Sequence, residues 1–234
     1  MLAQYIAEVQ RLLNDEGGQF FKIPTLTAYI NRARRRIAAI SGCIRCLPPG
    51  LLTHKGQERY PFSHMIPIIQ QEVPGAGEVL FVRSLSIAQG RGPGAWAPQW
   101  YQIPFTDFSA RFRVLDRTFL GNFNVPGWFA VFGSGPAAEL YLAPIPMRED
   151  RMLLDLTLLP TPLIEDSDDP CPLPYPWSDV VAFWAGVMAL LQQQRKEDAK
   201  VLSDLFTQMM PECAAVVMPQ FNVNSYAPGH IRSA

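Results

Sequence analysis

The placement of proline constrains the fold of this chain more than any other feature. The sequence contains 22 prolines, yet none lies among its first 23 residues. Proline interrupts helices and central strands, so the N-terminal segment can form long helices while the proline-rich middle is restricted to short elements. The hydrophobic fraction of 48% is sufficient for a packed core.

Helical periodicity marks the N-terminal segment. Apolar residues recur at spacings of three and four in residues 5–13, and a glycine-containing stretch, residues 14–18, ends this helix. A second helix with the same spacing is predicted for residues 24–42. Residues 1–46 are therefore predicted to be a helical hairpin.

Residues 47–170 are predicted to be an inserted β-rich module. Short runs of β-branched and aromatic residues alternate there with proline and glycine, which is typical of an antiparallel sandwich or barrel rather than of alternating βα units. The predicted strands are residues 66–73, 79–87, 100–104, 112–115, 128–132, 140–143 and 152–159. An acidic stretch, residues 165–169, is expected to be a linker leading out of the module.

Helical spacing returns in residues 171–213. Ser178 is the predicted N-cap of the next helix, and the last apolar pattern ends at Pro211. Residues 192–196 fit either a turn or the middle of one long helix. Residues 214–234 show no sustained period and are expected to form an extended tail.

These segments together predict an α+β fold. The expected architecture is a helical bundle built from the N- and C-terminal helical hairpins, because each hairpin must bury its apolar stripe. The antiparallel β-rich module is inserted between the hairpins, and the extended C-terminal tail docks on a partner.

Catalytic and metal-binding motifs are missing from the sequence. Cys43 and Cys46 have the spacing of half a zinc site, but no second cysteine pair exists to complete four ligands. His54, His64 and His230 are scattered and lie beside no nucleophile motif. We therefore expect no enzymatic activity, no metal and no cofactor, and we predict that the cysteines are packing residues.

The densest basic cluster consists of Arg32, Arg34, Arg35 and Arg36. Such a cluster is suited to nucleic acid or to an acidic neighbouring subunit, although a solvated helix face is the simpler explanation. The net charge of −1 argues against wrapping of nucleic acid. The cluster is a hypothesis for a subunit interface or a channel lining, and residues 165–169 of a neighbouring copy are its suggested acidic counterpart.

Neither membrane insertion nor a disulfide framework is expected. The apolar runs are far shorter than the ~18 residues of a membrane-spanning helix. Four cysteines are too sparse for a disulfide scaffold. These features predict intracellular assembly without disulfides.

Three segments in combination resemble tailed-phage head-to-tail adaptor proteins of the podovirus-like kind. The first is Leu-Thr-Ala-Tyr-Ile-Asn-Arg-Ala-Arg-Arg-Arg at residues 26–36, followed by Gly-Cys-Ile-Arg at 42–45. The second is Tyr-Leu-Ala-Pro-Ile-Pro at 141–146, which precedes residues 154–163. The third is Pro-Tyr-Pro-Trp-Ser-Asp-Val-Val at 174–181 with the stretch 194–199.

The resemblance implies a structural virion protein of the phage neck. Such adaptors form a homo-oligomeric ring, a dodecamer, that joins the portal protein to the tail nozzle or a tail fibre protein. The ring leaves a channel through which DNA passes without sequence-specific binding. Assembly is expected in the host cytoplasm.

The C-terminal tail of such an adaptor climbs onto the portal. In this chain its expected apolar anchors are Val216, Val217, Met218, Phe221, Val223, Tyr226 and Ile231.

Two alternative functions stay open. The chain can be another tail component, such as a tail terminator or a fibre-attachment protein. It can also be a carbohydrate-binding or hydrolytic module, for which Trp96, Trp100 and Trp128 should share an exposed face, although packing is the commoner use of tryptophan.

Overall fold

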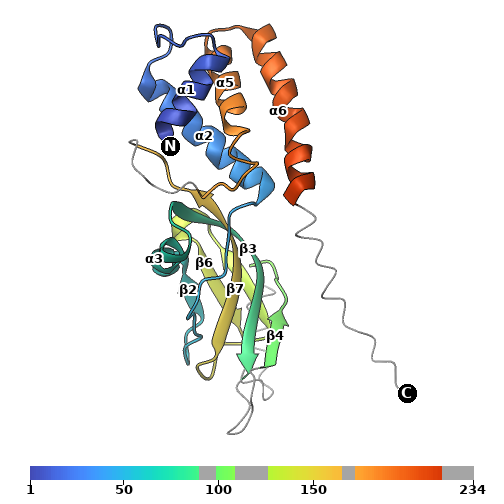
Figure 1. Ribbon diagram of the computed structural model, residues 1–234. Helices are drawn as coiled ribbons and strands as arrows, with labels where there is room; N and C mark the ends of the chain where they lie inside the picture. Colours follow the sequence, from blue (N-terminus) through green and yellow to red (C-terminus); the bar gives the residue numbers. More distant parts are fainter. Residues whose placement is uncertain (90–98, 109–125, 165–171, 218–234) are drawn as a thin grey trace, which may run out of the picture. The chain divides into compact units, whose positions relative to one another are not determined.

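The computed structural model describes residues 1–89, 99–108, 126–164 and 172–217 (Figure 1). Helices and antiparallel sheets are both present, which confirms the predicted α+β class. The chain divides into two compact units. The helical unit contains Met1–Ile37 and, among the described residues, 163–164 and 173–217, and the β unit contains Ala38–Pro162 and Pro172.

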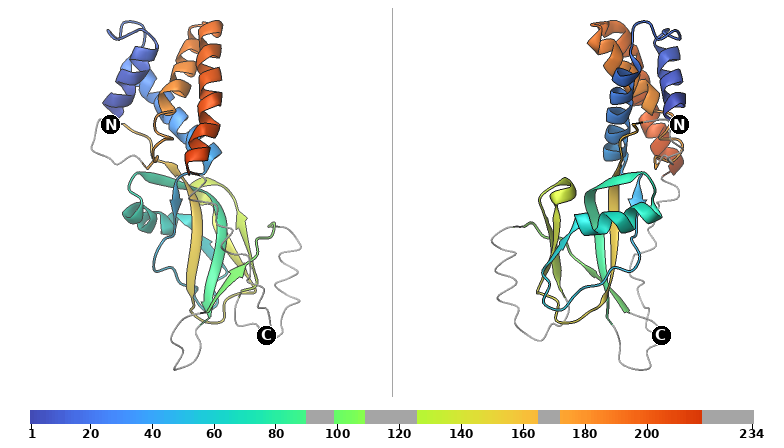
Figure 2. Two further views of the ribbon diagram at one scale, coloured as in Figure 1. Left: turned by 45° about the vertical axis from the view of Figure 1, so that its right-hand side comes forward. Right: turned by 90° about the vertical axis from the view of Figure 1, so that its left-hand side faces the viewer.

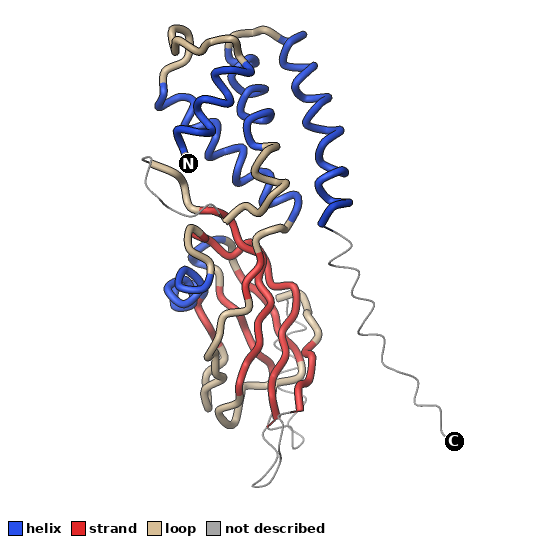
Figure 3. The backbone as a smooth tube through the Cα atoms, viewed as in Figure 1, coloured by secondary structure: helices blue, strands red, loops and turns tan. Residues whose placement is uncertain are grey.

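Four long helices supply the helical unit (Figure 3). They are α1 (Leu2–Leu12), α2 (Ile23–Ser41), α5 (Val181–Gln192) and α6 (Lys196–Val217), the last few residues of α2 being grouped with the β unit. Helix α5 contacts both α1 and α6. It is apolar around most of its circumference, with seven buried residues, as expected for a helix that packs against neighbours on several sides.

The C-terminal helical region consists of two helices. Residues 192–196 therefore include a turn and are not the middle of one long helix. Gln194 adopts a φ of 61° in the turn between α5 and α6. The predicted end at Pro211 is wrong, because α6 continues through this proline to Val217. Cys213, which lies beyond the proline, is buried, and its packing offsets the hydrogen bond that proline removes.

The predicted N-cap at Ser178 is also wrong. Helix α5 begins at Val181 with Val180 as its N-cap, and no side chain caps it. The Ser178 hydroxyl instead donates a hydrogen bond to Asp179 Oδ1 at 3.0 Å. Turns occupy the residues before α5, so the helix starts later than its sequence pattern suggests.

Two antiparallel sheets form the β unit, and Figure 2 shows them from two sides. In the first sheet the order is β1–β7–β3–β4, and in the second it is β2–β6–β5. The strands are β1 (Arg45–Cys46), β2 (Arg59–Pro61), β3 (Ala76–Gln89), β4 (Gln99–Ile103), β5 (Trp128–Phe132), β6 (Glu139–Ala143) and β7 (Arg151–Pro160). A short 3₁₀ helix, η1 (Gly135–Ala137), joins β5 to β6.

Two isolated bridges extend the pairing beyond the strands. Beyond β4, Phe105 pairs with Phe129 of β5, and ahead of β2, Leu52 pairs with Arg151 of β7. The hydrogen bonding therefore continues from the first sheet into the second at Phe105, and from β7 into the segment ahead of β2 at Leu52. We refer to the two sheets together as the barrel. Its buried apolar side chains include Leu85, Ile87, Phe129, Leu140, Leu142, Leu154 and Leu156. Three register shifts along β3 allow this long strand to curve around the barrel.

Most of the predicted strands are confirmed. The predictions for residues 79–87, 100–104, 128–132, 140–143 and 152–159 correspond to β3, β4, β5, β6 and β7. The prediction for residues 112–115 lies outside the described residues. Strands β1 and β2 escaped prediction because they contain only two and three residues.

The predicted strand at residues 66–73 is wrong, because this segment belongs to helix α3 (Phe62–Glu72). Phe62, Met65 and Ile69 are buried at spacings of three and four. A short apolar run fits a strand or a helix equally well by periodicity. The helix forms here because it packs against β2, β3 and η1 of the barrel.

Candidate interaction surfaces

The basic cluster on α2 does not form one surface. Arg34 is 1% exposed and directs Nη1 to Asn31 Oδ1 at 3.4 Å, so the structure removes it from the predicted interface or channel set. Arg32, Arg35 and Arg36 remain exposed. The helical period explains the difference, since Arg34 lies on the same side as the buried Ile30 and Ile37.

Arg36 is held against an aromatic pair. Its guanidinium carbon lies 4.0 Å from the centre of the Trp184 ring, which is a cation–π contact. Trp184 packs in turn against Phe206, with ring centroids 4.9 Å apart. These three side chains come from α2, α5 and α6, so Arg36 connects the three helices although it is itself exposed.

Asn31, which directly precedes Arg32, holds the segment that follows β7 against α2. Its Nδ2 donates to the Leu163 carbonyl, and its Oδ1 accepts from the Leu163 backbone N–H, both at 2.8 Å. This two-point contact pairs both polar groups of the half-buried Asn31 side chain with the backbone. Asn31 is therefore a structural residue, although it belongs to the segment that resembles phage adaptors.

The solvent side of α2 is basic and otherwise small. Four exposed residues recur at spacings of four, three and four: Ala28, Arg32, Arg35 and Ala39. Helix α2 contains no acidic residue between Ile23 and Ser41. We call these four residues the α2 basic face.

The solvent side of α6 has the opposite charge. Six exposed residues lie on one side of the helix at multiples of three and four: Glu197, Val201, Asp204, Leu205, Gln208 and Glu212. Val201 and Leu205 are 60% and 40% exposed. Lys196 and Lys200 lie about a quarter turn or more from the centre of this side. We call these six residues the α6 acidic face. The sequence analysis did not predict this face, although the spacing of its acidic residues is visible in the sequence.

The proposed tail anchors begin inside α6. Val216 and Val217 belong to the last turn of the helix, so the tail starts later than residue 214, and their side chains lie outside the description. Met218, Phe221, Val223, Tyr226 and Ile231 also lie outside the described residues, as does the acidic stretch 165–169.

An aromatic patch lies on the second sheet, and its centre is buried, because Tyr141 is 4% exposed. Tyr141 of β6 lies at its centre, with the Phe108 ring 4.5 Å and the Arg59 guanidinium carbon 5.3 Å from its own ring. Phe132 completes the patch and is 54% exposed. Burial, together with a hydrogen bond to the Glu139 carboxylate, raises the pKa of the Tyr141 hydroxyl. Aromatic and arginine side chains are the residues enriched at protein interfaces.

The outer side of the first sheet carries an arginine pair on one carboxylate. Arg45 of β1 binds Asp155 of β7 through two nitrogens, and Arg83 Nε lies 3.8 Å from the same carboxylate. Phe81 of β3 and Leu153 of β7 are 43% and 39% exposed. Since two guanidinium groups share one carboxylate, this patch keeps a net positive charge.

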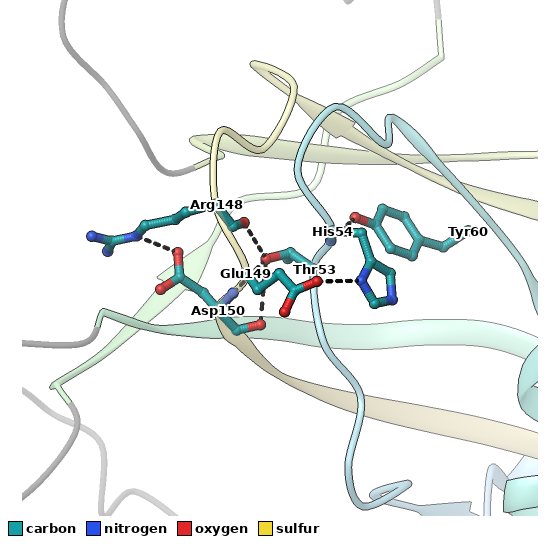
Figure 4. A network of polar contacts seen from close by, with 6 residues as sticks. All are labelled: Thr53, His54, Tyr60, Arg148, Glu149 and Asp150. Carbon is teal, nitrogen blue, oxygen red and sulfur yellow. Dashed lines mark hydrogen bonds and ion pairs between the residues drawn. The ribbon is translucent and has the colours of Figure 1, made fainter.

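The polar network around Thr53 closes the seam of the barrel (Figure 4). The Thr53 hydroxyl accepts the Asp150 N–H at 2.9 Å and lies 3.2 Å from the Arg148 carbonyl. The His54 N–H donates to the Tyr60 hydroxyl at 2.9 Å. These contacts join the segment before β2 to the turn before β7, so the network has a structural use.

His54 and Glu149 form an exposed pair at this seam, with Nδ1 and Oε1 3.2 Å apart (Figure 4). Burial raises the pKa of the neighbouring Tyr60 hydroxyl. A raised pKa keeps that hydroxyl protonated.

Cys46 and Cys213 have the properties of packing residues, since both are buried. Burial, together with the charge of Glu72, raises the pKa of the Cys46 thiol, and burial likewise raises that of Cys213. A raised pKa suppresses the reactive thiolate form. Within the described ranges, no group of three or more His, Cys, Asp or Glu side chains is placed to hold a metal ion.

The tryptophans proposed for sugar binding do not come from one sheet. Trp100 lies on β4 of the first sheet and Trp128 on β5 of the second, while Trp96 lies outside the described residues. Trp177 is 4% exposed and serves the core of the helical unit.

In the described part of the chain, no helix combines the length and the apolar composition that a membrane span requires. Comparison of the sequence with known protein families finds no matching family, and comparison with curated proteins finds no significant relative.

Proposed function

We propose that the protein is a structural connector of a tailed-phage neck, in which a homo-oligomeric ring joins the portal to a tail component and leaves a channel for DNA. One observation carries the proposal: each of the two compact units exposes large apolar side chains of its own. In the helical unit Phe20 and Val201 are 74% and 60% exposed, and in the β unit Phe105 and Phe132 are 57% and 54% exposed. Phe132 lies with Phe108 and Tyr141 in one aromatic cluster. Contiguous apolar groups at a surface are typical of interaction sites, and a connector must bind different partners at different places.

The resemblance of residues 26–36, 141–146 and 174–181 to phage adaptors supports the same function. In this proposal α1, α2, α5 and α6 form the bundle of the adaptor. The contacts of α5 with α1 and α6 support this arrangement, as does the contact of Arg36 with Trp184. The barrel is the inserted β-rich module, and the segment after Val217 is the tail that binds the portal.

Portal binding tests the function directly. Purified protein is mixed with portal rings from candidate phages, the complexes are weighed by light scattering, and they are imaged by negative stain. Saturating addition of a second ring supports the connector. Binding to a tail protein without affinity for any portal would support a tail terminator or a fibre-attachment protein instead.

The tail requires its own variants. Truncation after Val217 removes residues 218–234 and leaves helix α6 intact, whereas a cut at residue 214 would shorten the helix. A matched variant keeps the full length but replaces Phe221, Val223 and Tyr226 with serine. We expect both variants to lose portal binding while they keep the thermal stability of the wild type. Retained binding by the truncated protein would contradict the role of the tail alone.

A further inference from the structure

We propose that the α6 acidic face of one copy docks on the α2 basic face of the next copy, and that this contact builds the ring. The inference rests on the proposed connector function and deepens it by naming the two surfaces that meet. All ten residues of the two faces are exposed, so both faces can be reached by a neighbouring copy.

The charges of the two faces are complementary. The α6 acidic face carries Glu197, Asp204 and Glu212 and no basic residue. The α2 basic face carries Arg32 and Arg35, and its helix has no acidic residue. Each exposed ion pair contributes little by itself, but the opposite signs select this pairing over the contact of two equal faces.

The shapes of the two faces also match. Val201 and Leu205 protrude from the middle of the α6 acidic face, and the α2 basic face offers the small side chains of Ala28 and Ala39 on either side of its arginines. Small residues allow a neighbouring helix to approach closely, so the branched side chains can be buried against α2. Helices of 19 and 22 residues have similar lengths, about 28 Å and 33 Å.

One chain cannot join its own two faces. The α2 basic face lies opposite the buried Ile30 and Ala33, and the α6 acidic face lies opposite the buried Phe206. Both faces therefore point away from the interior of the helical unit. A contact between different surfaces of identical subunits is heterologous, and it closes into a ring when the rotation between neighbours permits.

Two charge-reversed proteins test the contact. The first carries Arg32→Glu and Arg35→Glu, so both of its faces are acidic. The second carries Glu197→Lys and Asp204→Lys, so both of its faces are more basic. Arg11→Glu on α1 is the matched control, because Arg11 is equally exposed but lies on neither face. The mass of each protein is measured by light scattering and analytical ultracentrifugation at low salt, alone and with portal rings.

We expect the wild type and the Arg11→Glu control to associate, and each reversed protein alone to associate about tenfold more weakly. An equal mixture of the two reversed proteins should recover assembly, because an acidic α2 then meets a basic α6. Three results would overturn the inference: a wild type that stays monomeric both alone and on the portal, reversed proteins that assemble like the wild type, or a mixture that fails to recover.

The same experiment separates this inference from the proposed function. If the reversed proteins still add a full ring to the portal, the α2–α6 contact is wrong and the connector function stands. If the charge changes abolish portal binding but not self-association, the faces bind the portal instead, and the contact between copies is wrong. If the wild type self-associates through these faces but binds no portal, the contact stands and the connector function fails.

Discussion

At the scale of single residues, position on a helix decides the role of each arginine in the α2 cluster. Arg34 is buried, Arg36 lies on the Trp184 ring, and Arg32 is turned to solvent. Neighbouring positions on a helix point about 100° apart, so a run of like residues is divided among different environments. The sequence showed the cluster, but only the packing of α5 and α6 against it assigned a role to each member.

Replacing Arg36 with alanine should lower the free energy of unfolding by about 0.5–1 kcal/mol, because the cation–π contact with Trp184 is lost. Arg32→Ala is the matched variant and should leave stability within about 0.5 kcal/mol of the wild type. Urea unfolding measures both. If both variants lose the same free energy of unfolding, the contact between Arg36 and Trp184 does not contribute to stability.

Asp15 supplies a pH-dependent contribution to stability. Desolvation by burial favours the neutral form of its carboxyl group, but hydrogen bonds from the backbone N–H groups of Phe21, Phe20 and Gln19 outweigh it and lower the pKa below the usual 3.8. A lowered folded pKa means that the contribution is complete above about 3.8 and disappears as the pH falls through the folded value.

Asp15→Asn should therefore be less stable than the wild type at neutral pH, and the difference should shrink in acid below the ordinary pKa of aspartate. Thermal unfolding of both proteins across this range measures the trend. A difference that stays constant with pH would mean that the carboxylate charge does not contribute.

At the scale of elements, the close contact of α5 with α6 depends on a glycine. A Cβ atom on Gly186 would lie 2.9 Å from Leu202 Cδ1. This methyl group ends a flexible side chain, so a small substituent can be accommodated. A large one would force the helices apart.

Gly186→Ala is expected to be nearly neutral, because the higher helix propensity of alanine, about 1 kcal/mol, offsets the crowding. Gly186→Leu should lower the free energy of unfolding by about 1–3 kcal/mol through overpacking. Chemical unfolding followed by circular dichroism distinguishes the two variants. A leucine variant as stable as the alanine variant would contradict the tight α5–α6 contact.

The barrel seam depends on the Thr53 hydroxyl. Thr53→Val leaves the buried N–H of Asp150 without its acceptor, so we expect a loss of about 1–3 kcal/mol. Thr53→Ser keeps the hydroxyl and should cost less than about 1 kcal/mol. If denaturant unfolding gives the same loss for both variants, the missing methyl group rather than the hydrogen bond is responsible.

At the scale of the whole molecule, two units with their own exposed apolar groups are suited to assembly. Assembly through the α2 and α6 faces should weaken as salt is raised, because the Debye length falls from about 10 Å at 0.1 M to about 3 Å at 1 M. Light scattering over a salt series measures this. Assembly that strengthens with salt would assign the contact to apolar groups instead of charges.

The sequence by itself determined the α+β class, the N-terminal helices, the antiparallel pairing and five strands of the β unit. These features follow from local periodicity and from the positions of proline and glycine, which act on the chain before any long-range contact forms.

Only the tertiary structure decided the features that depend on distant partners. It made residues 62–72 a helix because the barrel offers that segment a surface, and it carried α6 past Pro211 because Cys213 is buried. It also buried Arg34 while it left Arg32 exposed. Burial is a property of what packs against a residue, and residues far apart in the sequence supply that packing.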